Sequence, residues 1–84
     1  MDRIVVADDH PLFRAALRSA VEKAAPGAVI AECASLAEVL ATLGEGAADL
    51  LLLDLKLSDS EGMGGLTRIR ADHPAVPPRA VGVL

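Results

Sequence analysis

Large aromatic side chains are nearly missing from this sequence, and this limits how its core can be built. There is no Trp and no Tyr, and Phe13 is the one aromatic residue among 84. The core must then consist of Leu, Ile, Val and Ala, which have to pack closely because no large ring fills the space. A chain of this length buries only about 60–65% of its unfolded surface, so we expect one small domain.

Cysteine is scarce and long apolar runs are absent. Cys33 has no second cysteine to pair with, which favours a reducing, cytoplasmic setting, and we interpret it as a small apolar strand residue. No run approaches the ~18 apolar residues of a membrane span. The apolar stretch at residues 4–7 is too short for a secretory signal. The sequence therefore predicts an intracellular domain.

Positive charge is in the minority. Eight Lys and Arg against twelve Asp and Glu give a formal net charge of -4. Direct nucleic-acid binding by this segment is disfavoured, because such binding needs a basic surface. The acidic balance is compatible with a site for a cation or for a basic partner.

What the sequence does contain is an alternation of two kinds of segment. Short apolar runs are typical of strands covered on both faces, and amphipathic stretches between them predict helices. We expect strands at residues 4–7, 28–33, 50–53 and 79–84. We expect helices from Pro11 to before Pro26, from Ser35 to Gly44 or Gly46, and from Gly62 to Ala71. This order predicts an α/β fold with a parallel sheet and helices on its faces.

Apolar residues at helical spacing predict which side of each helix faces the sheet. The expected inward residues are Phe13, Leu17 and Val21 in the first helix, Leu36, Val39, Leu40 and Leu43 in the second, and Met63, Leu66 and Ile69 in the third. Ser35 and Glu38 have the spacing of a capping box, which predicts the start of the second helix.

Three acids follow predicted strands directly: Asp8 and Asp9 after the first, and Asp54 after the third. Sites in parallel sheets lie at the carboxyl ends of strands, so these carboxylates are expected at one edge. Taken singly, Asp8 and Asp9 also fit helix capping, and Asp54 fits a strand-end acid turned to solvent. Together they would repel unless a cation holds them. Carboxylate oxygens suit Mg²⁺, and one carboxylate could act as nucleophile towards a phosphoryl group.

The stretches "IVVADDHPLFRAAL" (residues 4–17) and "DLLLLDLKLSDSEGM" (49–63) resemble the response-regulator receiver domain, most closely the NarL/FixJ type. The resemblance spans the chain and implies a flavodoxin-like (CheY-like) fold with strand order 2-1-3-4-5. It implies a sensor histidine kinase as phosphoryl donor, a helix-turn-helix output domain that usually follows the receiver, and control of transcription. The site residues it implies are Asp54 as phosphoacceptor, with Mg²⁺ held by Asp8, Asp9, Asp54 and the backbone carbonyl of Lys56.

Other polar residues near this motif are expected to have structural or solvent-exposed roles. Ser58 stands where the family often has Pro, and Asp59 and Glu61 are expected to be solvated loop acids. We interpret His10 as the start of the first helix rather than a catalytic imidazole, and His73 as the end of the third.

Compared with the family, residues 1–84 are expected to form a partial receiver that lacks the fourth helix, the fifth strand, the fifth helix and any output domain. The family's switch hydroxyl and pairing lysine would then be missing, since neither Lys23 nor Lys56 fits that role. Loss of one such donor costs about 3 kcal/mol in an electrostatic site, so impaired phosphorylation is expected. The fourth strand would be an open edge, which predicts a homodimer or higher oligomer through edge pairing or exchanged elements.

Two other functions compete with the phosphoacceptor domain, which is not itself an enzyme in the usual sense. One is a non-signalling self-association module derived from a receiver. The other is an aspartyl-phosphate hydrolase with an Asp-x-Asp motif, but Asp8 and Asp9 lack the spacer and Asp54-Leu55-Lys56 lacks the second acid.

Overall fold

Strands and helices alternate along the whole computed structural model, which describes residues 2–59, 64–77 and 80–83. The described strands are β1 (Arg3–Ala7), β2 (Val29–Cys33), β3 (Leu50–Leu53) and β4 (Val81–Val83). The described helices are α1 (Pro11–Ala24), α2 (Leu36–Glu45) and α3 (Gly64–Asp72). The strands pair in parallel in the order β2-β1-β3-β4. The predicted α/β class and the flavodoxin-like order of these strands are therefore confirmed.

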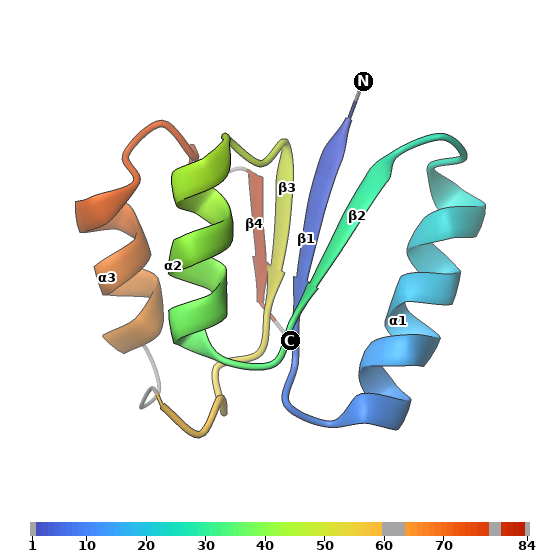
Figure 1. Cartoon of the computed structure of the whole chain (residues 1–84), viewed down its shortest axis with the longest axis horizontal. Coiled ribbons are helices and arrows are strands. Elements are labelled where there is room, and N and C mark those ends of the chain that lie inside the picture. Colours follow the sequence, from blue (N-terminus) through green and yellow to red (C-terminus); the bar gives the residue numbers. More distant parts are fainter. Residues whose placement is uncertain (1, 60–63, 78–79, 84) are drawn as a thin grey trace.

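Figure 1 shows three layers, with α1 on one face of the sheet and α2 and α3 on the other. The expected and observed boundaries agree closely wherever the structure describes them. Gly62 and Met63 of the expected third helix, and Arg79 and Leu84 of the expected fourth strand, lie outside the described residues. Among the described residues, no helix is long and apolar enough to cross a membrane.

The two faces of the sheet carry cores of different size. The larger core lies between the sheet and the α2–α3 layer, and the smaller one lies under α1. Alternate residues of the central strands divide between them, so that Val5 and Leu51 are fully buried on one side and Val6 on the other. Burial on both faces explains why these strands are continuous apolar runs. The larger core contains Val5, Ala7, Cys33, Leu36, Val39, Leu43, Ala48, Leu51, Leu53, Leu57, Leu66, Ile69, Val76 and Ala80.

The prediction for the inner side of the first helix is wrong at Phe13. Its side chain is 53% exposed, and Leu12 beside it is 87% exposed. Val21 and Leu17 do pack against Ile4 and Val6, as expected. Phe13 lies two turns before Val21 on the same stripe, and the small core under α1 takes none of its described members from the first turn of that helix. Helical spacing locates a stripe but does not show how far the sheet extends beneath it.

Side chains cap both ends of α2, locally at its start and from a distant segment at its end. At its start Ser35 Oγ accepts from Glu38 N at 3.1 Å, and Glu38 Oε2 accepts from Ala34 N at 2.7 Å, so the predicted capping box is present with its return bond shifted by one residue. At its end the Arg3 guanidinium donates to the carbonyls of Gly46 and Thr42, the latter at 2.9 Å. Positive charge at a helix C-terminus also interacts favourably with the negative end of the helix dipole.

The Arg3 contacts lead to a stability prediction. Replacing Arg3 with Ala leaves two helix-end carbonyls without their charged donor, so we expect Arg3→Ala to lower the free energy of unfolding by about 2 kcal/mol. Urea denaturation followed by circular dichroism measures this. Arg68→Ala is the matched control, because it removes only an exposed ion pair to Asp72 and should cost about 0.5 kcal/mol or less. Equal losses in the two variants would contradict the role given to Arg3.

Candidate functional site

The acids that follow β1 and β3 meet because these two strands are neighbours in register. Ala7 lies opposite Leu53 at their carboxyl ends. The backbone N–H of Asp54 donates to Ala7 O at 3.0 Å, and that of Asp8 donates to Cys33 O on β2 at 3.0 Å. These bonds continue the strand ladder by one residue. The Asp8 and Asp54 side chains therefore start from fixed backbone positions at one edge of the sheet.

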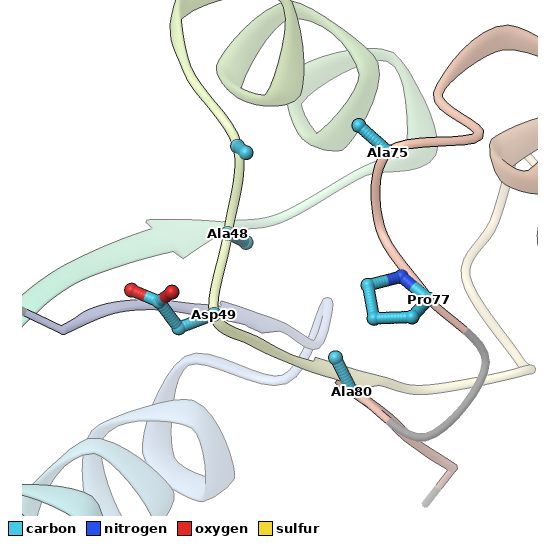
Figure 2. A pocket seen from close by; sticks show the side chains of 6 residues that line it. Ala48, Asp49, Ala75, Pro77 and Ala80 are labelled. Atoms are coloured by element: carbon cyan, nitrogen blue, oxygen red, sulfur yellow. The ribbon is translucent and has the colours of Figure 1, made fainter.

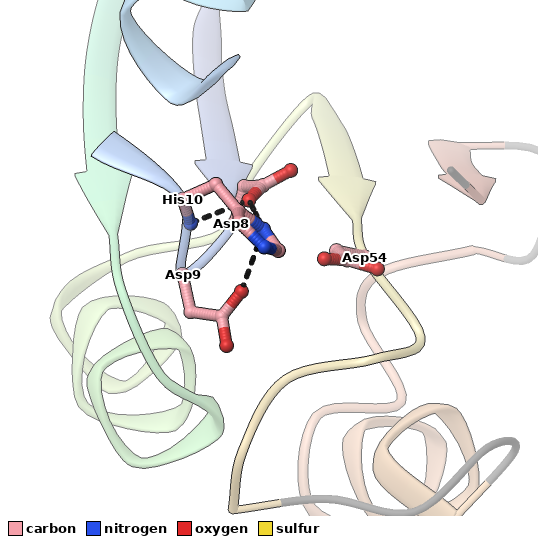
Figure 3. Close-up of side chains that lie close together, drawn as sticks. All are labelled: Asp8, Asp9, His10 and Asp54. Carbon is pink, nitrogen blue, oxygen red and sulfur yellow. Dashed lines mark hydrogen bonds and ion pairs between the residues drawn. The ribbon is translucent and has the colours of Figure 1, made fainter. Parts of the chain in front are cut away.

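Asp8, Asp9, His10 and Asp54 form a compact cluster at this edge (Figure 3). Each residue offers one ligand atom, and these atoms all lie within 4.8 Å of one another. Asp8 is only 2% exposed and Asp54 8%. Burial of like charges so close together is unfavourable unless positive charge or donors compensate them. The arrangement indicates a site for a positively charged ligand.

His10 belongs to this cluster, which was not predicted from the sequence. It is the N-cap residue of α1, as expected for the start of the first helix, but it makes no side-chain capping bond. Its ring Nδ1 lies 3.2 Å from Asp8 Oδ1 and 3.0 Å from Asp9 Oδ1. Asp8 Oδ1 also accepts from the His10 backbone N–H at 2.7 Å. Asp8 thus has both a local structural role and a place in the cluster, so the two readings of that residue are compatible.

The donor set fits a hard cation such as Mg²⁺. Among the described side chains, Asp9 Oδ1 is the buried oxygen that has no hydrogen-bond partner, although His10 Nδ1 lies 3.0 Å from it. Such an orphaned buried oxygen is costly without a ligand. Carboxylate oxygens from three residues are the ligand type that Mg²⁺ and Ca²⁺ prefer, and Mg²⁺ usually retains several waters as well.

Arg14 supports the backbone beneath the cluster and was also missed at the sequence level. Its Nη1 donates to the carbonyl oxygen of Asp8 at 2.7 Å, and its Nε donates to Glu32 Oε1 at 3.2 Å. Glu32, on β2, also accepts from Arg18 Nη1 at 3.1 Å. This ion-pair chain joins α1 to the edge strand and fixes the point where Asp8 leaves β1. The sequence signal was an arginine one helical turn after His10.

The loop after Asp54 is fixed at several points. The Lys56 backbone N–H donates to Asp54 Oδ1 at 2.9 Å, which folds the chain back over the carboxylate. Lys56 itself is exposed, as expected for a residue whose side chain is a solvated amine, and Leu57 is buried in the larger core. Ser58 is exposed, while Glu61 lies outside the described residues. The loop therefore leaves the site in a defined direction.

Asp59 is more than the solvated acid expected from the sequence. It is exposed, but its carboxylate accepts from Leu36 N at 2.7 Å and from Ala37 N at 3.0 Å, at the start of α2. These backbone hydrogen bonds lower the pKa of Asp59 below its ordinary value. Asp59 does not belong to the metal-type cluster. Its partners are 22 and 23 residues away in sequence, so no local pattern could have identified them.

The other end of the strands, away from the acids, carries a mainly apolar hollow. A hollow there is lined mainly by small apolar side chains (Figure 2), and its single carboxylate, Asp49, already accepts from the Arg3 backbone N–H at 2.7 Å. It lies where β3 and β4 begin, away from the acids. His73 lies close by in sequence, and its N–H donates to Ile69 O, which confirms it as the end of the third helix. The lining residues are Ala47, Ala48, Asp49, Ala75, Pro77 and Ala80.

Sequence comparison finds a family and relatives that match most of this chain. The family model of the response regulator receiver domain matches residues 4–82. The glycerol metabolism activator of Pseudomonas putida is 40% identical over 78 residues, which are 92% of this chain and 35% of that protein. The chain thus spans about a third of the length of this curated relative.

Solved structures agree on the fold. A LuxR-family two-component response regulator from Aurantimonas sp. SI85-9A1 matches with a TM-score of 0.80 at 28% identity, over 96% of this chain and 56% of that one. The response regulator TrrA from Thermotoga maritima, solved in complex with Mg(2+)-BeF, matches with a TM-score of 0.78 at 25% identity, over 99% and 66% of the two chains.

TrrA has also been solved in complex with the histidine kinase ThkA, and there the TM-score is 0.82 at 25% identity, over 99% and 67% of the chains. The likeness therefore holds for sequence, fold and strand order together. The chain belongs to the response regulator receiver domain family.

Proposed function

We propose that Asp54 accepts a phosphoryl group from a sensor histidine kinase, that this phosphorylation controls transcription, and that the protein is cytoplasmic. The observation that carries the proposal is the meeting of Asp54 with Asp8 and Asp9 at the end of the central strands. Receiver domains are phosphoacceptor domains rather than enzymes in the usual sense. The TrrA–ThkA complex supports a kinase as the partner. Because the chain spans about a third of the length of its curated relative, control of transcription is proposed for the whole protein and not for residues 1–84 alone.

In the proposed reaction a carboxylate oxygen of Asp54 attacks the phosphorus atom of a phosphohistidine. The new O–P bond forms as the N–P bond to the kinase histidine breaks, and the histidine nitrogen keeps the bonding electron pair. Asp54 is suited to this role because the register of β1 and β3 fixes its backbone. The Lys56 N–H bond to Oδ1 holds one carboxylate oxygen, which orients the other towards the incoming group.

Asp8, Asp9, Asp54 and the backbone carbonyl of Lys56 would hold Mg²⁺. When bound, this ion would neutralise negative charge on the transferred phosphoryl oxygens. Asp8 is held at two points, because Arg14 donates to its backbone carbonyl and the His10 N–H donates to its carboxylate. Asp9 offers the buried oxygen without a hydrogen-bond partner. The Mg(2+)-BeF complex of TrrA supports this assignment by similarity.

The test is phosphorylation of the 84-residue chain by acetyl phosphate and Mg²⁺, followed by intact mass. We expect wild type to gain one phosphoryl group and Asp54→Asn to gain none. The reaction should be slow, because neither lysine fits the family's pairing role: Lys23 lies in the last turn of α1, and Lys56 lies in the loop directly after Asp54. Asp49→Asn is the matched control, since Asp49 directly precedes the same strand β3 at its other end. This variant should be phosphorylated on Asp54 as wild type is.

Thermal unfolding with Mg²⁺ and beryllofluoride gives a second readout. At ligand concentrations 100 times the dissociation constant, binding stabilises the folded state by about 2.7 kcal/mol, and this gain should vanish in Asp54→Asn. Equal phosphoryl uptake or equal stabilisation in wild type and Asp54→Asn would sink the assignment of Asp54.

A second candidate function is self-association, in which the chain forms a homodimer or higher oligomer whether or not it is phosphorylated. It is favoured by the edges of the sheet: Val83 on β4 is 49% exposed and Val29 on β2 is 48% exposed. Within the described residues, β4 pairs with β3 alone. Unprotected strand edges are templates for pairing with another chain.

Light scattering of the 84-residue chain tests self-association. We expect a mass of at least two chains for wild type and a shift towards one chain for Val83→Lys, because a charged side chain on an edge strand discourages pairing. Val81→Ile is the control, since it keeps the strand apolar on its inner side. A wild-type chain that stays monomeric at all concentrations contradicts this candidate. An oligomer unaffected by acetyl phosphate would favour it over a phosphorylation-controlled dimer.

A further inference from the structure

Two loops meet at Asp59, one after the proposed phosphoacceptor strand and one before α2. Asp59 is the fifth residue after Asp54, and its carboxylate spans the first two backbone N–H groups of α2, those of Leu36 and Ala37. The distances of 2.7 and 3.0 Å are those of charge-assisted hydrogen bonds. The contact ties the loop of the acidic site to a helix whose own residues take no part in the cluster.

We propose that Asp59 is a positioning residue for the metal and phosphoryl site: it anchors the loop 54–59 to the start of α2 and so sets where the Lys56 carbonyl lies relative to Asp8, Asp9 and Asp54. The inference rests on the proposed function, because it assigns a role within that same site. Asp59 is not a member of the cluster, and its carboxylate is bonded to Leu36 and Ala37 of α2, so it acts through the loop.

The anchor acts on a short piece of chain. Asp54 Oδ1 accepts from Lys56 N at one end of the loop, and Leu57 is buried at 1% exposure in the middle. Asp59 fixes the other end through two bonds. Lys56 therefore lies between anchored residues on both sides, which defines its backbone orientation. Groups that orient metal ligands from behind commonly contribute 10–100-fold in metal affinity, even though they do not touch the ion.

The role of Asp59 can be separated from ordinary capping of α2. Ser35 satisfies a different donor of the same helix end, the Glu38 N–H, at 3.1 Å. Val39 N donates to the Ser35 carbonyl at 3.2 Å. Ser35→Ala thus removes one capping hydrogen bond from the helix and leaves the bonds between the loop and α2 in place. Asp59→Ala removes the acceptor of the Leu36 and Ala37 N–H groups, and so also releases the loop from α2. A merely structural role predicts similar consequences for the site in the two variants.

The experiment compares wild type, Asp59→Ala, Asp59→Asn and Ser35→Ala in the 84-residue chain. Mg²⁺ alone is titrated by calorimetry, and phosphorylation by acetyl phosphate is followed at increasing Mg²⁺. We expect Asp59→Ala to bind Mg²⁺ about tenfold more weakly, with its rate returning to the wild-type maximum at saturating Mg²⁺. Asp59→Asn keeps one acceptor oxygen and should be intermediate. Ser35→Ala should change Mg²⁺ affinity less than about twofold. Urea unfolding should nevertheless reveal a loss of stability in both alanine variants.

The outcomes separate this inference from the proposed function. If wild type binds Mg²⁺ and is phosphorylated on Asp54 while Asp59→Ala matches it in affinity, the positioning role is overturned and the proposed function stands. Equal weakening in Ser35→Ala and Asp59→Ala also overturns it, because capping of α2 would then be sufficient. If wild type neither binds Mg²⁺ nor takes up phosphoryl groups, both proposals fail. Measurements at a temperature well below the unfolding midpoint of each variant keep the comparison among folded chains.

Discussion

Parallel pairing of β1 with β3 is the constraint on which the rest of the molecule depends. The register places Ala7 opposite Leu53, and the following residues, Asp8 and Asp54, emerge side by side. Successive strand residues point to opposite faces, so a slip of one residue would exchange the leucines of β3 between the two cores and would separate the acids. The apolar contacts that specify the register are therefore the same contacts that assemble the site. Core packing and the geometry of the acidic edge cannot vary independently.

This arrangement concentrates negative charge directly after fully buried strand residues. The neighbouring residues compensate in different ways: Arg14 binds the Asp8 carbonyl, His10 lies between the Asp8 and Asp9 carboxylates, and the Lys56 N–H binds Asp54. None of these contacts gives Asp9 Oδ1 a hydrogen bond. The described donors thus hold Asp8 and Asp54, while a buried carboxylate oxygen of Asp9 is left without a hydrogen bond. That is the distribution expected where a cation, rather than another side chain, completes the site.

The sequence was informative where the physics is local or periodic. Strand ranges, helix ranges, the capping box at Ser35 and the strand-end position of the acids all follow from patterns of a few residues, and the structure agrees with them. It was uninformative where a contact joins distant segments. The partners of Asp59 lie 22 and 23 residues away, and those of Arg3 lie near the end of α2. The prediction that Phe13 faces inward is wrong for a related reason. How far the sheet extends beneath α1 depends on the tertiary structure and not on the helical spacing.

Helix α2 is the element in which these long-range contacts converge. Its buried face, with Val39 fully enclosed, packs on the larger core. The guanidinium of Arg3 binds its last carbonyls and the carboxylate of Asp59 binds its first N–H groups, so each end meets the charge that the helix dipole favours. Since Arg3 begins β1 and Asp59 lies in the segment that follows β3, α2 is linked to both central strands. A helix without site residues thus helps to set the relative position of the strands that deliver Asp8 and Asp54.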